Sequence, residues 1–108
     1  MGYRREFPDY DGEFKIPKGF RDNSWHNDTC PHVMKRFENG DNVVEFDIWQ
    51  DYEDPDLREN EERYIFQVFV NEQLIMQFVS DYWDDMETLA NGTTDEMYGW
   101  KNFFTKER

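Results

Sequence analysis

The chain has 108 residues and a formal net charge of −13 at pH 7, with 25 Asp and Glu against 12 Lys and Arg. This length predicts a single domain spanning residues 1–108. The acidic excess argues against direct binding to nucleic acid, which needs a basic surface to displace counterions from phosphate. No apolar run approaches the roughly 20 residues of a membrane span, and residues 1–6 lack the apolar stretch of a secretion signal, so we expect a soluble, cytoplasmic protein.

Aromatic residues indicate that the chain folds rather than remaining disordered. There are 10 Phe, 6 Tyr and 4 Trp, and each aromatic side chain can bury roughly 150 to 250 Å². Leu, Ile and Val together number only 13, and Ala90 is the only alanine. Abundant aromatics and scarce alanine favour strands over helices. We therefore expect a domain with an aromatic-rich core and a substantial β-sheet.

Residues 1–31 are predicted to be mostly irregular, because three prolines and three glycines interrupt them. Within this segment the stretch Glu13–Ile16 is the candidate strand. Four aromatic residues are expected to anchor the segment to the rest of the domain: Phe7, Phe14, Phe20 and Trp25.

A β-hairpin is predicted next, with strands at Val33–Glu38 and Asn42–Tyr52. Asn-Gly at positions 39 and 40 is a pair favoured in tight hairpin turns. In the second strand, apolar residues at alternate positions from Val44 to Ile48 are separated by Glu45 and Asp47. This alternation indicates a strand with one buried face and one solvent-facing side.

A second hairpin is predicted after an acidic loop at Asp51–Arg63, with strands at Tyr64–Val70 and Leu74–Val79. A three-residue connection, Asn71–Gln73, would place one set of side chains on a shared face, whereas a two-residue connection would shift the faces. The set that the longer connection predicts is Phe66, Val68, Val70, Leu74, Met76 and Phe78.

Two helices are predicted between residues 80 and 105. Ser80 or Asp81 can cap the first helix, and Gly92 can end it. Its apolar residues are Tyr82, Trp83, Met86, Leu89 and Ala90. The stretch Thr93–Glu96 matches a capping box for the second, which would carry Met97, Trp100, Phe103 and Phe104 at helical spacing. The predicted fold class is therefore α+β, an antiparallel sheet of four to five strands with two C-terminal helices and an irregular N-terminal segment.

The acidity is concentrated in the middle of the chain. Residues 38–96 hold eighteen acidic and two basic side chains, whereas the segments on either side are slightly basic. Such runs are most often solvated faces, and acids on edge strands also deter aggregation. The more specific hypothesis is a surface that imitates nucleic-acid phosphate and binds a basic partner, because charge repulsion on this scale costs stability and suggests a use.

A phosphate mimic needs closely spaced charges. Same-face residues of a strand lie roughly 6.8 Å apart, whereas one DNA strand carries a charge about every 3.4 Å. Glu45 and Asp47 would supply about half of that density, so a second row from the loop or the first helix is required. The predicted partner-contact residues are Glu45, Asp47, Trp49, Asp51, Tyr52, Glu53, Asp54, Asp56, Glu59, Glu61, Glu62, Asp81, Asp84 and Asp85, with the two aromatic residues as anchors.

The second candidate site contains both histidines and the only cysteine within seven residues. His26, Cys30 and His32 could ligate a metal with Asp28 as a fourth ligand, although their spacing matches no standard zinc pattern. Cys30 could also act as a nucleophile paired with either histidine. We favour a structural role with a buried cysteine. No cofactor and no catalytic residue is predicted, and a lone cysteine fits a reducing compartment.

One segment resembles a stretch of small uncharacterised bacterial and phage proteins: Gly19-Phe20-Arg21-Asp22-Asn23-Ser24-Trp25-His26-Asn27-Asp28-Thr29-Cys30-Pro31. In size, acidity and aromatic content, the chain is similar to small phage-encoded inhibitors of host defence, including anti-CRISPR proteins, several of which mimic nucleic acid. This resemblance implies a non-enzymatic inhibitor of a basic, nucleic-acid-binding protein in the host cytoplasm, acting as a monomer or homodimer. Two alternatives stay open: a small metal- or thiol-dependent protein, and a structural domain that self-associates.

Overall fold

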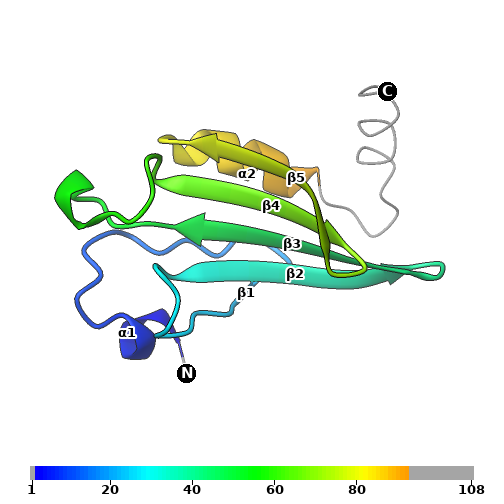
Figure 1. Cartoon of the computed structure of the whole chain (residues 1–108), viewed down its shortest axis with the longest axis horizontal. Coiled ribbons are helices and arrows are strands. Elements are labelled where there is room, and N and C mark those ends of the chain that lie inside the picture. The colour runs from blue at the N-terminus through cyan, green and yellow to red at the C-terminus, as the bar shows by residue number, and fades with distance from the viewer. Residues whose placement is uncertain (1, 93–108) are drawn as a thin grey trace.

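The computed structural model describes residues 2–92, which form a five-stranded antiparallel sheet with one helix packed on a face (Figure 1). The strand order β1-β2-β3-β4-β5 follows the chain order. The elements are α1 (Tyr3–Glu6), β1 (Arg21–Asp22), β2 (His32–Asn39), β3 (Asn42–Gln50), the 3₁₀ helix η1 (Pro55–Leu57), β4 (Tyr64–Val70), β5 (Gln73–Ser80) and α2 (Trp83–Asn91). The predicted α+β class is confirmed.

The N-terminal segment contains a short helix and a different strand from the one predicted. The strand prediction at Glu13–Ile16 is wrong: β1 is the N-terminal strand, and it pairs with Val33 and Met34 of β2. The backbone of Lys15 bonds instead to the side chain of Gln50. The Lys15 N–H donates to Gln50 Oε1 at 2.9 Å, and the Lys15 carbonyl accepts from Gln50 Nε2 at 2.6 Å. The fully buried Gln50 amide thus satisfies backbone groups that a neighbouring strand would otherwise satisfy.

The first predicted hairpin is confirmed, but its second strand ends at Gln50 and not at the predicted Tyr52. β2 pairs over its whole length with residues 42–49 of β3, and the turn lies one residue later than predicted, at Gly40 and Asp41. Gly40 has a φ of 63°, a left-handed conformation that glycine adopts without steric cost.

The second hairpin has a two-residue turn in place of the predicted three-residue connection. Val70 pairs directly with Gln73, and the two turn residues between them both have positive φ, 51° for Asn71 and 69° for Glu72. This combination is that of the type I′ turn, which matches the twist of the flanking strands.

A bulge in the same hairpin corrects the register that the shorter turn would otherwise shift. The pairing is irregular between Val68 and Phe69, so Val68 still pairs with Met76 on the inner face, as predicted. Leu74 instead pairs with Phe69 and is 50% exposed, so its predicted core position is wrong. The two-residue turn shifts the pairing of Phe69 and Val70 by one residue relative to the prediction. The extra residue at the bulge then restores the predicted pairing from Val68 and Met76 onward, so the prediction fails only next to the turn.

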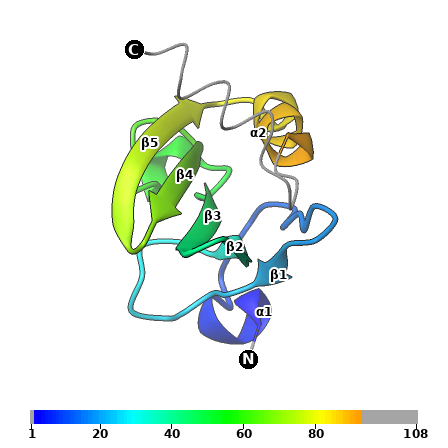
Figure 2. The ribbon, with the colours of Figure 1, turned by 90° about the vertical axis from the view of Figure 1, so that its right-hand side faces the viewer.

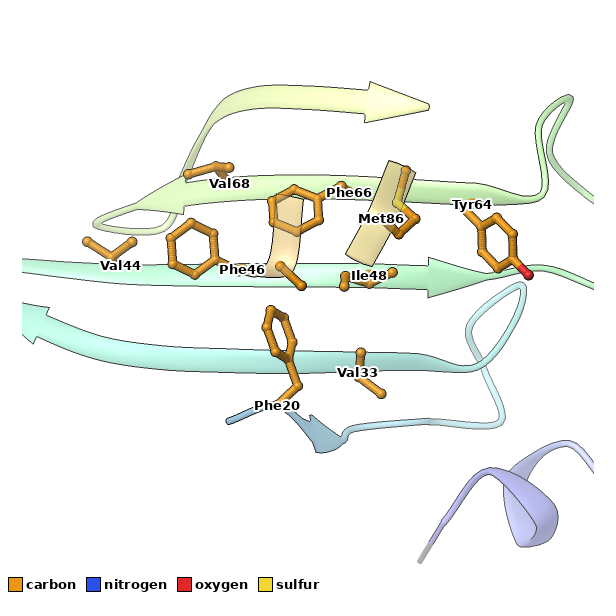
Figure 3. Packing of buried hydrophobic residues seen from close by; sticks show 10 residues of the cluster. Phe20, Val33, Val44, Phe46, Ile48, Tyr64, Phe66, Val68 and Met86 are labelled. Atoms are coloured by element: carbon orange, nitrogen blue, oxygen red, sulfur yellow. The ribbon is translucent and has the colours of Figure 1, made fainter. Parts of the chain in front are cut away.

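The core lies between the inner face of the sheet and α2 (Figures 2 and 3). Met86 of α2 is fully buried against the sheet, and Ala90 lies one helical turn further along. The remaining buried members of the cluster are Phe20, Val33, Val44, Phe46, Ile48, Tyr64, Phe66 and Val68. This face of the sheet therefore provides the hydrophobic core that stabilises the fold.

The first predicted C-terminal helix is present as α2, but its start differs from the prediction. Tyr82 is the residue before the helix and is 72% exposed, so it does not belong to the apolar side. Ser80 accepts a hydrogen bond from the Tyr82 N–H and donates one to Asp85, so it stabilises the approach to the helix. The second predicted helix, residues 93–105, lies outside the described residues. Neither described α-helix is long and apolar enough to cross a membrane.

Candidate functional site

The sheet topology brings two of the three predicted acidic segments to one end of the molecule. β3 ends at Gln50, β4 begins at Tyr64 and β5 ends at Ser80, and these three residues pair across the sheet. The loop of residues 51–63 and the start of α2 therefore leave the sheet at the same end (Figure 1). We call this surface the acidic end, and its carboxylates are Asp9, Asp11, Glu53, Asp54, Asp56, Glu59, Glu61, Glu62, Asp81, Asp84 and Asp85.

Two of these carboxylates, Asp9 and Asp11, come from the N-terminal segment and were not predicted as site residues from the sequence. Asp11 accepts hydrogen bonds from the N–H groups of Glu53 at 2.8 Å and Asp54 at 2.9 Å. Asp9 accepts one from the hydroxyl of Tyr52 at 3.0 Å. Burial acts to raise the pKa of Asp11, but the backbone N–H donors and the Arg63 charge together outweigh it and hold that pKa below its usual value. The only local signal was a pair of aspartates two residues apart.

Asp51 organises the loop from inside and is not a contact residue. Its side chain is fully buried. The carboxylate accepts hydrogen bonds from the N–H groups of Tyr52, Glu59 and Asn60 at 2.8 to 3.2 Å, and from the Asn60 side chain at 2.9 Å. The prediction that Asp51 meets a partner is wrong, because its oxygens are used to hold the loop backbone in place.

The loop's two arginines, Arg58 and Arg63, form hydrogen bonds that hold the loop in place. Arg58 donates to the carbonyl oxygens of Tyr52 at 2.7 Å and Glu53 at 2.8 Å, and its guanidinium lies 3.6 Å from the Asp81 carboxylate. The backbone N–H of Arg63 donates to Asp81 at 3.0 Å, which ties the end of the loop to the start of α2. The two guanidinium groups together donate to three backbone carbonyls, and Asp81 is the carboxylate of the acidic end that lies within salt-bridge distance of one of them among residues 2–92.

Several exposed carboxylates at the acidic end remain available to a partner. Glu53, Asp56, Glu59 and Glu61 are exposed, and among residues 2–92 none of their carboxylates forms a salt bridge. Eleven carboxylates against two internally bonded arginines produce a negative field that reaches about 8 to 10 Å into physiological salt.

The acids of β3 do not extend this surface. Asp47 is only 4% exposed, so its predicted contact role is wrong. Its burial, together with the neighbouring Glu45, raises its pKa to about 8, so most of it is protonated at neutral pH. Glu45 lies 3.9 Å from Arg36 and is about 20 Å along the chain from the loop. The strand therefore supplies no row of charges beside the acidic end.

The two predicted aromatic anchors are engaged within the protein. Trp49 is half-buried, stacks on His32 with 3.9 Å between ring centroids, and donates its indole N–H to Gln67. Tyr52 is also half-buried and bonded to Asp9. Tyr82, at 72%, and Leu57, at 51%, are the more exposed large side chains at this end. They are better suited as anchors than the residues that the sequence suggested.

The constellation of His26, Cys30 and His32 is not assembled into a site. Cys30 is fully buried, and burial together with the nearby Asp51 charge raises its pKa to about 12. His26 is exposed and bonded to Glu6 at 2.8 Å, whereas His32 is buried, which lowers its pKa. Within residues 2–92 no three His, Cys, Asp or Glu side chains are placed to hold a metal ion. The predicted metal ligands His26, Asp28, Cys30 and His32 are thus not brought together as a metal site, and the predicted burial of Cys30 is confirmed.

The acidic end is a surface of exposed carboxylates on the loop of residues 51–63 and at the start of α2. Its exposed carboxylates sit on a loop whose backbone is bonded inward, a combination suited to binding cationic groups. No protein-family model, no curated protein sequence and no solved structure matches this chain, so the geometry of the acidic end carries the functional proposal.

Proposed function

We propose that this protein is an acidic interaction module of the anti-defence inhibitor type. Its acidic end binds a basic surface of a nucleic-acid-binding partner in place of nucleic-acid phosphate, and thereby blocks that partner. The observation that carries the proposal is the meeting of three acidic segments, residues 9–11, 51–63 and 81–85, which the sheet brings together from distant parts of the chain.

The way these segments are held supports binding over mere solvation. Asp51 and Asp11 accept hydrogen bonds from five backbone N–H groups of the loop, so the exposed carboxylates stand on a fixed backbone. A fixed array of charges loses little conformational entropy when a partner binds.

Apolar anchors lie among the charges. Leu57 projects from η1 and Tyr82 precedes α2, and both side chains are more than half exposed. Charged surfaces mainly accelerate encounter and select partners, whereas a few aromatic or aliphatic residues usually provide most of the affinity. We therefore expect carboxylates to recognise basic residues and Leu57 and Tyr82 to occupy apolar positions between them.

Two charge-reversal variants test the proposal. Asp56 and Glu59, each changed to Lys, reverse exposed charges of the acidic end. The matched control changes Glu38 and Asp41 to Lys at the opposite end of the sheet, with the same change in net charge. Each immobilised variant is incubated, at about 100 mM salt, with proteins eluted from a DNA column, and retention is measured with and without competing duplex DNA.

The proposal predicts that the native protein and the control variant retain the same DNA-binding proteins and release them when duplex DNA is added. The acidic-end variant is expected to lose at least about tenfold in retention. Equal retention by the two variants would refute binding through the acidic end. Retention that duplex DNA does not reverse would refute the phosphate-mimic mechanism.

A further inference from the structure

The strand β5 forms one edge of the sheet and lacks the usual protection against pairing. It is eight residues long, and among residues 2–92 no strand lies on its outer side (Figure 2). Between Gln73 and Ser80 it has no charged residue and no proline, although 34% of the chain is charged. Natural edge strands are normally short, charged, bulged away or covered.

The side chains of β5 are also exposed. Leu74, Ile75 and Val79 are each about half exposed, at 50%, 47% and 46%. The bulge opposite Phe69 lies near the turn and leaves the regular pairing from Met76 to Ser80 undisturbed. On its outer side the strand therefore offers an edge that no other strand of residues 2–92 bonds, together with the apolar side chains of Leu74, Ile75 and Val79 on which an added strand could pack.

The opposite edge of the sheet is protected. β1 covers the start of β2 at Val33 and Met34. The remainder of β2 carries Lys35, Arg36 and Glu38, and charged residues at an edge disfavour pairing with another chain. The lack of protection against pairing is therefore specific to the β5 edge and is not shared by the β1 and β2 edge.

We infer that β5 receives an extended segment of a partner protein, which adds to the sheet as a sixth strand with an uncharged middle and basic ends. The acids at the two ends of β5 specify this chemistry: Glu72 precedes the strand, and Asp81 and Asp85 follow it, all exposed. Eight residues span about 26 Å, so a segment of similar length places Lys or Arg beside both groups of acids.

A second copy of this chain fits the edge less well. An antiparallel pair of β5 strands related by a two-fold axis would bring Glu72 of one copy toward Asp81 and Asp85 of the other. Like charges at both ends of the added strand oppose pairing, and each chain carries −13 overall.

The inference rests on the proposed function, because it assigns the basic partner a second mode of recognition next to the acidic end.

Peptide binding to the full chain tests the inference. The probe is a short synthetic peptide with alternating Val and Thr between two pairs of lysines. The control peptide has the same lysines but proline at every Thr position, which preserves its charge and prevents strand pairing. We expect the probe to bind at least about tenfold tighter by fluorescence anisotropy, and to slow hydrogen exchange of the β5 amides.

A pair of protein variants locates the site. Ile75→Lys with Val79→Lys is expected to abolish the preference for the probe, whereas Glu38→Gln with Asp41→Asn, which changes the net charge equally at the other end, is expected to keep it. Thermal melts of both variants confirm that they are folded. Equal affinity for the two peptides, or a preference that survives the β5 substitutions, overturns the inference.

The outcomes also separate this inference from the proposed function. Loss of DNA-binding proteins by the acidic-end variant without any peptide preference refutes the β5 site alone. A peptide preference without any effect of acidic-end reversal refutes the proposed function alone. A dimer of the native protein that the β5 substitutions convert to a monomer would identify a second copy as the occupant and overturn the heterologous partner.

Discussion

Replacement of Asp51 with alanine is expected to destabilise the whole fold. The buried carboxylate is the shared acceptor for three backbone N–H groups and one side-chain amide. Alanine removes all four hydrogen bonds and leaves donors of Tyr52, Glu59 and Asn60 without their acceptor. The Asp51 carbonyl also accepts from Tyr10 and Arg63, so a shift of the residue disturbs the contact with the N-terminal segment.

The expected loss follows from the number and charge of these bonds. A hydrogen bond to a charged group contributes about 1.5 to 3 kcal/mol, but the values for one acceptor do not add. Removing one partner of a buried charged network typically costs about 3 to 5 kcal/mol. Total stabilities are about 5 to 15 kcal/mol. With roughly 4 °C per kcal/mol for a domain of this size, Asp51→Ala is expected to lower Tm by at least about 12 °C.

Circular dichroism melts and urea denaturation measure this loss. Asp56→Ala is the control, because Asp56 is exposed and only its backbone N–H is bonded, to Asp54. Its effect is expected to stay within about 0.5 kcal/mol. Asp51→Asn keeps the shape and part of the bonding, so it should fall between the two. If Asp51→Ala melts within a few degrees of the native protein, the carboxylate does not organise the loop as described.

Two further substitutions test the backbone and the buried acid. Glu72→Gly relieves the left-handed conformation at φ 69° and is expected to stabilise the protein by about 1 kcal/mol in urea melts, so an unchanged midpoint would contradict the strain. Burial raises the pKa of Asp47 from 3.8 to about 8, so folding takes up a proton in this range and stability falls as pH rises through it. Asp47→Asn, which is always neutral, is expected to match the native protein near pH 3, below the unfolded-state pKa, and to exceed its stability by about 3 to 6 kcal/mol near pH 9. A stability difference independent of pH would rule out this titration.

Local patterns were sufficient for most of the elements. The alternation from Val44 to Ile48, the Asn-Gly pair at the first turn and the apolar spacing of Met86 and Ala90 correctly predicted β3, its hairpin and α2. Each of these patterns involves residues that are close in the sequence, so local backbone geometry is sufficient to determine the secondary structure there. The Glu13–Ile16 prediction failed because a buried side chain, Gln50, replaced a neighbouring strand.

The candidate site was predicted less completely, because its composition depends on contacts across the chain. The acidic loop and the start of α2 were recognised from their charge, but Asp9 and Asp11 were missed since they are about 40 residues away from the groups they contact. Leu57 and Tyr82 were not distinguished from core residues, because exposure of an apolar side chain is set by what packs over it.

The sequence by itself determined the fold class, the strands of the two hairpins, and the location of the charge in the middle of the chain. Only the tertiary structure decided which carboxylates face solvent. Asp47 and Asp51 have the same charge as Asp56 in the sequence, yet both are buried and Asp56 is exposed. Burial depends on long-range packing, and it converts a carboxylate from a surface charge into a proton-holding or backbone-bonding group.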